Sequence, residues 1–538
     1  MIKEYSRIKL KKFSLKIADF LEKSFSKENG FNCREYYGTA FSIWLWSLLG
    51  KDFDKVRLEA LEYLSTITPP SFGRQYHWEF VRFALGEAKN LGGLGAYSST
   101  KQLLGDEKFC RTRVANWTML RSTVRLRDGG FFNKLLAHLE RHIALLVFQR
   151  SSGFIEDTRC DPTSQYHAFS TALLGLQILR SPIAKRMHIK RFSKAINALD
   201  RLVFPSGDSN VLGRGQKQSF GYSASILAYI LAGEIFSNSY YIEKSFLIEK
   251  YISSFFRGNH SIPLVLRKGE KFVISEVDTT DPEFSGWYSY NNFFDYLSFT
   301  GALIAFSYEI FEKSKLNKTN ILKNKKYIPL ESTKNAHTDD IQDSIRIIKK
   351  SKYCAIVVPP GKSLAGGMPL PFIELADGVQ PLPCYGGEMH QPSLYRPEGL
   401  PLPALVGTKE SQLEVLYCPG RYRWVTTDQF VGKGPGWTHF RRVIAENDFI
   451  VIEDEVEFER GFPENKSLMM PRFLLLADDV LEAGDQIVRG RGITVQADAP
   501  LSEEVDPQWC ALGQLKVFSA RRPAHTMRSK SSILISIC

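Results

Sequence analysis

The feature of this 538-residue chain that most constrains its fold is a change in the spacing of its apolar residues. Up to about Glu312, apolar residues recur at three- and four-residue steps, which is the spacing of amphipathic helices. Beyond Asp340 the chain breaks into short β-rich runs separated by Gly, Pro and Asp. Two periods in succession predict two domains of different class, and the length of the chain also favours two domains.

The first half repeats one unit, a helix followed by a polar loop. The clearest helical runs are "KLLAHLERHIALLVFQR", "FSTALLGLQILRS", "FSKAINALDRLVF", "YSASILAYILAGEIF" and "FDYLSFTGALIAFSYEIFEK". Loops rich in Gly and Asp, such as "LRDGGFF", separate them. This repetition predicts an N-terminal (α/α) toroid, an incomplete barrel over residues 1–315. The functional loops of such a fold gather at one rim.

The second half contains short strands with no helices among them. A polar stretch rich in Lys and Asn over residues 316–342 predicts an interdomain linker, so the break between domains is expected within residues 313–345. Runs such as "YCAIVVPP", "FIVIEDEVEFERGF" and "SILISIC" then predict a C-terminal antiparallel β-sandwich over residues 343–538. The predicted fold class is therefore multidomain, α followed by β.

Composition indicates the kind of partner. A formal net charge of +12 suits a polyanion. The basic residues are dispersed and show no zinc-finger spacing or RNA-binding motif, so an acidic polysaccharide fits better than nucleic acid. The eight cysteines show neither close pairing nor metal-ligand spacing. The N-terminus lacks a signal-peptide pattern, and the apolar run at residues 40–50 is too short to span a bilayer. We therefore expect no membrane span and, by default, a cytoplasmic protein.

A Tyr-His pair, Tyr166 and His167, stands where an acidic, turn-prone stretch passes into an apolar helix pattern. The preceding loop already offers Asp161, Thr163 and Ser164 as helix caps, so capping does not require the pair. Two interpretations remain open. Either the pair does chemistry at a cleft, or it packs under the loop and hydrogen-bonds locally.

Three further features have the composition of a ligand site. Arg214 lies between two glycines, which allow close approach of a ligand to the backbone. No strand pattern precedes these glycines, as it would in a phosphate-binding loop, which excludes a nucleotide site. The loop "GWYSYNNFF" concentrates aromatic side chains suited to stacking on sugars. His390 lies in a proline-rich loop where neither strand pairing nor core packing requires a histidine. A second pair, Tyr76 and His77, precedes an aromatic-rich helix pattern, which favours a core role.

Together with the order of the two domains, these motifs make the chain resemble the heparinase II/III-like polysaccharide lyases. The segments that carry the resemblance are "ANWTMLRS", "GFIEDTRCDPTSQYHAFSTALLG", "GRGQKQSFGYSA", "GWYSYNNFFDY", "GGEMHQPSLYRPEG" and "GWTHFRR". In that family a toroid Asn neutralises the uronate carboxylate, a Tyr or His removes the C5 proton, and a sandwich His closes the cleft. The resemblance gives these roles to Asn116, to Tyr166 or His167, and to His390. Many members carry a His directly after the toroid Asn, where this chain has Trp117.

The resemblance implies a lyase that cleaves a uronate-containing polysaccharide by β-elimination without an organic cofactor. Removing the C5 proton places a second negative charge beside a carboxylate, so the site needs amide or cationic donors and a Tyr or His. We expect substrate contacts from Arg214, Gln216, Tyr222, Trp287, Tyr288, Tyr290, Asn291, Arg396 and Arg441. No residue cluster has zinc-site spacing, and a structural divalent cation in the sandwich is left open.

The sequence leaves three alternatives to a lyase. A glycoside hydrolase would need two carboxylates in the toroid, and Glu156, Asp157, Asp161 and Asp208 are available. A uronate epimerase would begin with the same proton abstraction. A polysaccharide-binding or assembly protein without catalysis is favoured by Trp117 at the family's His position.

Overall fold

The structure is a computed structural model in which two compact units are each described by themselves. The described residues are 2–33, 35–66, 77–97, 114–158, 163–213, 215–266, 292–314, 338–342, 345–357, 372–381, 404–407, 413–415, 423–426, 428–434, 436–459, 466–503, 508–510, 513–523 and 527–538.

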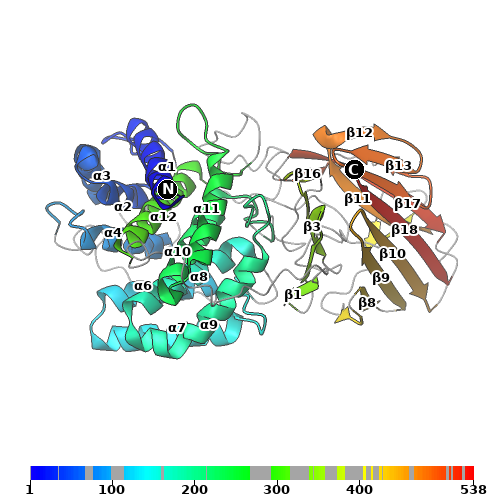
Figure 1. Ribbon diagram of the computed structural model, residues 1–538, viewed down its shortest axis with the longest axis horizontal. Coiled ribbons are helices and arrows are strands. Elements are labelled where there is room, and N and C mark those ends of the chain that lie inside the picture. Colours follow the sequence, from blue (N-terminus) through cyan, green and yellow to red (C-terminus); the bar gives the residue numbers. More distant parts are fainter. Residues whose placement is uncertain are drawn as a thin grey trace. The chain divides into compact units, whose positions relative to one another are not determined.

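The first unit is helical, and Figure 1 shows its helices with their labels. The described helices are α1 (Ile2–Ser24), α2 (Gly38–Leu49), α3 (Asp54–Thr66), α4 (His77–Asn90), α6 (Ala115–Asp128), α7 (Phe131–Phe148), α8 (Ser164–Arg180), α9 (Pro182–Arg201), α10 (Ser219–Phe236), α11 (Ser239–Ser253) and α12 (Phe293–Lys313). A 3-10 turn, Lys51–Phe53, precedes α3.

Six of these helices form an inner ring. α2, α4, α6, α8, α10 and α12 each pack against the next, and α12 packs against α2 to close the ring. The others lie outside it: α1 against α12, α3 against α2, α7 against α6, α9 against α8, and α11 against α10. This is the predicted (α/α) toroid. α12 joins α10 to α2, since it is buried along nearly all of its first 15 residues and contacts both helices.

The inner helices owe their close packing to apolar and small side chains. α10 is buried from Ser219 to Gly233, and in α12 a Cβ on Gly301 would lie 2.8 Å from both Ile17 and Leu45. By length and composition α10 could cross a membrane, but 83% of it is buried inside the helical unit. Core packing therefore accounts for its apolar composition.

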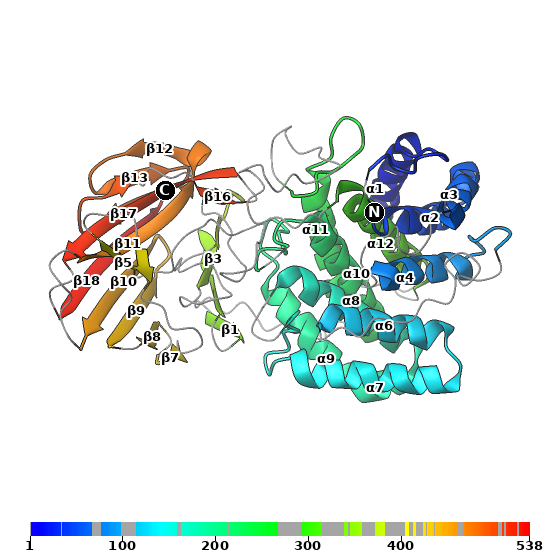
Figure 2. The ribbon, with the colours of Figure 1, turned by 180° about the vertical axis from the view of Figure 1, so that it is seen from behind.

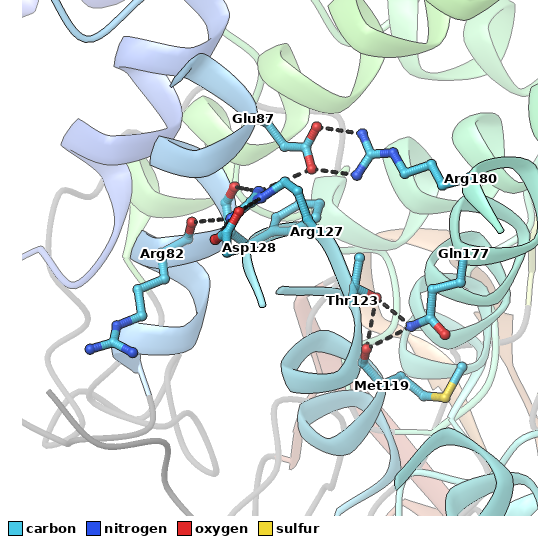
Figure 3. A network of polar contacts seen from close by, with 9 residues as sticks. Arg82, Glu87, Met119, Thr123, Arg127, Asp128, Gln177 and Arg180 are labelled. Atoms are coloured by element: carbon cyan, nitrogen blue, oxygen red, sulfur yellow. Dashed lines mark hydrogen bonds and ion pairs between the residues drawn. The ribbon is translucent and has the colours of Figure 1, made fainter. Parts of the chain in front are cut away.

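A charged cluster joins three inner helices near their C-terminal ends (Figure 3). Glu87 of α4 accepts hydrogen bonds from Arg180 of α8 at 2.7 and 2.5 Å and from Arg127 of α6 at 3.1 Å. Burial opposes ionisation, yet the two guanidinium groups hold the pKa of Glu87 below its usual value. Both arginines lie in the last turn of their helix, where positive charge complements the helix dipole. The cluster fixes this end of the ring.

The second unit contains three sheets, and every strand pairing in its described residues is antiparallel. The four-stranded sheet has the order β1 (Thr338–Gln342), β2 (Ile345–Lys349), β3 (Tyr353–Val357), β4 (Phe372–Leu375). The eight-stranded sheet has the order β12 (Val480–Ala483), β13 (Ile487–Gly490), β14 (Ile493–Ala497), β18 (Arg528–Ile537), β10 (Phe449–Phe458), β9 (Trp437–Ala445), β8 (Gln429–Gly434), β7 (Arg423–Trp424). The six-stranded sheet has the order β15 (Ser502–Glu503), β17 (Gly513–Pro523), β11 (Lys466–Leu476), β5 (Ala404–Gly407), β6 (Leu413–Val415), and β16 (Gln508–Cys510) also pairs with β17.

The eight-stranded sheet buries one face, as the predicted sandwich requires. Burial alternates along β10 and β18, so successive side chains point into the core and away from it. Residues of β11 contact β18, which brings the two sheets together. The four-stranded sheet is an addition that the sequence did not predict. The Tyr353 hydroxyl on β3 ties it to the main-chain oxygen of Glu446, between β9 and β10, at 2.8 Å. The last described helix ends at Lys313 and the first strand begins at Thr338.

Candidate functional site

The first turns of the inner helices meet at one rim of the ring. Contacts join them in order: Asp295 of α12 to Tyr37 before α2, Tyr36 to His77 of α4, His77 to Trp117 of α6, Tyr166 of α8 to Phe220 of α10, and Phe220 to Tyr296 of α12. Each helix N-terminus carries partial positive charge and main-chain N–H groups without a partner inside the helix. A rim built of helix N-termini therefore favours an anionic ligand.

Asn116 lies in the first turn of α6, on this rim. Its side chain is 2% exposed, and no described residue hydrogen-bonds its Oδ1 atom. The N-cap of α6 is Val114, so Asn116 is not the helix cap. In the first turn of α8, Thr163 Oγ1 and Gln165 Oε1 are likewise buried without a hydrogen-bond partner among the described residues. Such groups are rare in folded proteins unless water or a ligand satisfies them.

The loop between α7 and α8 connects the starts of α6 and α8. The carbonyl of Asp157 accepts a hydrogen bond from the N–H of Ala115 at 2.9 Å. Two residues earlier, the N–H of Ile155 donates to Nδ1 of His167 at 2.9 Å. This loop thus places the first turns of α6 and α8, which carry Asn116 and the Tyr-His pair, beside each other.

His167 is a structural residue. Its side chain is 0% exposed and stacks on Phe154, with ring centroids 4.3 Å apart. Both ring nitrogens contact main chain, Nδ1 at Ile155 and Nε2 at the carbonyl of Ala195, 3.1 Å away. Burial lowers the pKa of His167 to about 3. These contacts do not fit the predicted role as base, because neither nitrogen can reach a substrate proton.

Tyr166 faces a different environment from its neighbour. It is half-buried, whereas the residues on either side of it are fully buried. Its ring packs edge-on against Phe220 of α10, with centroids 6.2 Å apart. The Tyr-His pair is therefore divided between two roles, with His167 holding the loop and Tyr166 presented at the rim.

His77 is a rim residue that is 4% exposed, in agreement with the core role that the sequence favoured. It opens α4, and its ring packs 4.4 Å from that of Tyr36 and 5.8 Å from that of Trp117. An imidazole thus lies beside the residue that follows Asn116, although it comes from another helix. The signal in the sequence was the tripeptide Gln-Tyr-His, which ends at His77 and recurs at Gln165–His167.

Two carboxylates meet where α12 and α2 begin. Asp295 accepts hydrogen bonds from the N–H groups of Tyr36, Tyr37 and Gly38 at 2.6–3.1 Å, and Glu35 accepts one from the N–H of Thr39 at 2.7 Å. Burial raises the pKa of Asp295 to about 8, and the Glu35 carboxylate adds to the effect. A Cβ on Gly38 would lie 2.7 Å from Glu35 Oε2 and 3.1 Å from Asp295 Oδ1, so this closure of the ring requires glycine.

Gln216 and Tyr222, which were predicted to contact substrate, are instead inside the fold. Both side chains are fully buried. Gln216 Nε2 donates to the carbonyl of Val211 at 2.9 Å, and the Tyr222 hydroxyl donates to Asp208 at 2.7 Å. Asp208 is also ion-paired with Lys217. These bonds hold the loop before α10, and the full burial of both side chains does not fit the prediction that they bind substrate.

Arg441, also predicted to bind substrate, is buried between the strands of the sandwich. Its guanidinium group bonds both carboxylate oxygens of Asp454, at 2.5 and 3.1 Å, and His439 Nε2 lies 2.7 Å from the same carboxylate. Arg441 is 0% exposed and pairs in register with Asp454 of β10. Although burial opposes ionisation, the Arg441 guanidinium and the hydrogen bond from His439 hold the pKa of Asp454 down to about 2. Arg441 therefore stabilises the sheet and is not available to a polysaccharide.

Of the carboxylates considered for a hydrolase, Asp157 is fully buried, and Glu156 and Asp208 are engaged elsewhere. Glu156 is fully buried and ion-paired with Arg150, and Asp208 is held by Lys217, Tyr222 and Tyr251. Glu156 and Asp208 therefore do not form the pair of opposed carboxylates that glycosidases use.

Several predicted site residues lie outside the described residues: Arg214, Trp287, Tyr288, Tyr290, Asn291, His390 and Arg396, together with Asp161 of the hydrolase alternative. Within the described part of the chain, no group of three or more His, Cys, Asp or Glu side chains has the arrangement of a metal site.

No protein-family profile and no curated protein sequence matches this chain. Solved structures do. The chondroitin AC lyase of Streptomyces coelicolor, in complex with chondroitin sulphate, is 11% identical with a TM-score of 0.52, and the match covers 99% of this chain and 79% of that one. A xanthan lyase of Paenibacillus is 8% identical with a TM-score of 0.51, covering 98% of this chain and 57% of that one.

A heparan sulfate lyase of Pedobacter heparinus is also similar, at 12% identity, over 91% of this chain and 78% of that one. Its TM-score of 0.32 is too low for us to base an argument on it. At such identities a likeness establishes the fold and not the substrate. This chain is a divergent representative of the architecture of polysaccharide lyases, an (α/α) toroid followed by antiparallel β-sheets.

Proposed function

We propose that this protein is a lyase that cleaves a uronate-containing polysaccharide by β-elimination at the rim of the toroid. The observation that carries the proposal is the position of Asn116 and Tyr166 in the first turns of adjacent inner helices. Asn116 lies buried in the first turn of α6 without being its N-cap, and Tyr166 is the half-buried member of the Tyr-His pair. An amide beside a phenol is the set of groups that uronate elimination needs.

Each group has a part in the reaction. The Asn116 amide donates to the uronate carboxylate, which stabilises the charge that develops when C5 loses its proton. The Tyr166 phenolate takes that proton. The C5–H electron pair forms the C4–C5 double bond, the bond from C4 to the glycosidic oxygen breaks, and that oxygen accepts a proton from the Tyr166 phenol, which restores the phenolate.

Tyr166 has to be ionised to act as a base. A free phenol has a pKa of about 10, and positive charge nearby lowers it. The helix N-termini of the rim supply partial positive charge, and we assign the cation to Arg214, as the sequence resemblance implies. We keep His390 as the residue that closes the site and the aromatic loop with Trp287 as the sugar platform. His77, beside Trp117, is a second group that can carry a proton at the rim.

Two properties make an acidic polysaccharide the substrate class. The chain carries a formal net charge of +12, and the rim is built of helix N-termini. The solved structures with the same fold include a chondroitin lyase bound to chondroitin sulphate and a xanthan lyase, so polymers of both kinds belong in a first screen.

The test is to incubate the protein with a panel of uronate polymers and follow ultraviolet absorbance and reducing ends together. Elimination creates a double bond conjugated with the carboxylate, so we expect absorbance and reducing ends to rise in step. New reducing ends without absorbance would identify a hydrolase. Exchange of the C5 proton with solvent, without cleavage, would identify an epimerase. Saturable binding without either would identify a binding protein, and each of these three results contradicts the proposal.

A further inference from the structure

The outer helix α7 has two apolar faces, and only one of them is buried. Ala137, Ala144, Leu145 and Phe148 face the inner ring. The other face is exposed to solvent, and its members are Phe131, Phe132, Leu135, Leu136, Leu139, Ile143 and Leu146. The two phenylalanines are 77% and 82% exposed. A continuous exposed apolar face of this kind marks an interaction surface.

The neighbouring helix α9 extends this surface and adds positive charge. α7 and α9 lie side by side on the outside of the ring in both views (Figures 1 and 2), and Arg191 of α9 donates to the carbonyl of Leu145 at 2.9 Å. Four exposed side chains of α9 follow helical spacing along one face: Ile183, Met187, Lys190 and Lys194. Lys185 and Arg186 are exposed beside them.

The charge on this surface has one sign. Every exposed charged side chain of α7 and α9 is basic. They are Lys134 on α7 and Lys185, Arg186, Lys190 and Lys194 on α9. The acidic residues of the two helices are half-buried and engaged: Glu140 bonds Arg121 at 2.9 Å, and Asp200 bonds the hydroxyl of Tyr240 at 2.6 Å. Exposed Phe and Leu beside Lys and Arg is the composition of helices that lie in the interface of an anionic membrane.

We propose that the α7–α9 face binds the surface of an anionic lipid bilayer, with Phe131 and Phe132 entering the interfacial layer. Charge decides between this partner and a second copy of the chain. A twofold dimer would bring the same patch of each copy together, so basic residues would face basic residues. An anionic bilayer offers the opposite charge to the lysines and an apolar layer to the rings. Because the face lies on outer helices, it is separate from the rim that carries Asn116 and Tyr166.

The experiment is vesicle flotation of the full chain. Vesicles of phosphatidylcholine alone are compared with equimolar phosphatidylcholine and phosphatidylglycerol, at low and high salt. We expect the protein to float with the phosphatidylglycerol vesicles, and salt to weaken this binding because it screens the lysines. Replacing both rings, Phe131→Ser with Phe132→Ser, should weaken binding by at least about tenfold, since each buried ring contributes to transfer from water.

Two further variants separate the surface from general effects. Lys190→Gln with Lys194→Gln should weaken binding by about fivefold per charge, as basic residues near an anionic surface do. The matched control is Leu481→Ser, because Leu481 on β12 is 73% exposed and belongs to the other unit. It should float like the wild type. All four replaced side chains of the test variants are exposed, so the thermal midpoint of each variant should equal that of the wild type.

Three results would overturn the proposal. They are no flotation with phosphatidylglycerol vesicles, flotation that both test variants retain in full, and a wild-type dimer in light scattering that the phenylalanine variant converts to monomers. The last result would identify the face as an interface between copies.

Discussion

The main-chain N–H of Ile155, in the loop between α7 and α8, donates a hydrogen bond of 2.9 Å to Nδ1 of His167 on α8. Because Nδ1 accepts, the hydrogen-bond network places the ring proton on Nε2, which donates to Ala195 at 3.1 Å. The imidazole is thereby fixed in one neutral form. This relationship assigns the two members of the Tyr-His pair to different tasks, and it can be tested in three ways.

Replacing Tyr166 by Phe removes one oxygen and keeps the ring that packs on Phe220. If Tyr166 is the base, kcat should fall by about 10²–10⁴, the usual contribution of a general base, while the thermal midpoint changes little. The measurement is initial rate by ultraviolet absorbance on a polymer that the wild type cleaves. Full activity in a folded Tyr166→Phe protein would show that another group takes the proton.

Replacing His167 by Leu should act on stability instead. The change leaves the N–H of Ile155 and the carbonyl of Ala195 buried without partners, at a cost of about 2–5 kcal/mol of unfolding free energy. Denaturant unfolding measures this. A His167→Leu protein with wild-type stability but no activity would show that His167 acts in catalysis and not in stability.

The pH dependence of the unfolding free energy tests the same structural role of His167. The pKa of His167 is lowered to about 3, so below its unfolded value of about 6.5 the unfolded chain binds a proton that the folded chain does not. The contribution of the buried, neutral imidazole to the unfolding free energy is complete above about pH 6.5 and is lost as the pH falls towards 3. In His167→Leu the slope of stability against pH in this window should be shallower than in the wild type.

Replacing Asn116 by Ala should lower kcat/KM by about 10²–10³, as the loss of a donor to a developing negative charge does. Asn116→Asp should lower it further, because a carboxylate repels the uronate. The control is Asn197→Ala, since Asn197 is exposed on α9. Equal activity of the Asn116 and Asn197 variants would contradict the assigned role.

Replacing Asp454 by Ala should destabilise the β-rich unit by about 3–5 kcal/mol, because it leaves Arg441 buried without its counter-ion. The folded pKa of Asp454 is depressed to about 2, so its contribution is present above the unfolded value of about 3.9 and lost as the pH falls to 2. Asp428→Ala is the matched control, as it breaks an exposed bond to Arg442 of 2.7 Å. Equal melting of the two variants would refute the buried pair as a stabilising contact.

The sequence by itself determined the fold class. Apolar spacing is a local property, so the change from a helical period to a period of two predicted a toroid followed by a sandwich, and short motifs drew attention to Asn116 and Tyr166. The sequence also showed Trp117 where many members of the resembled family carry a His, but it did not predict that His77 packs against Trp117.

Only the tertiary structure decided which polar residues are available to a ligand. Gln216, Tyr222 and Arg441 have the chemistry of substrate contacts, but all three side chains are fully buried in the fold. The ring itself closes through Asp295, which bonds the N–H of Tyr37 from 258 residues away. The physical reason is that the spacing of apolar residues is a property of neighbouring positions, whereas burial and charge pairing depend on contacts between segments that are distant in the chain.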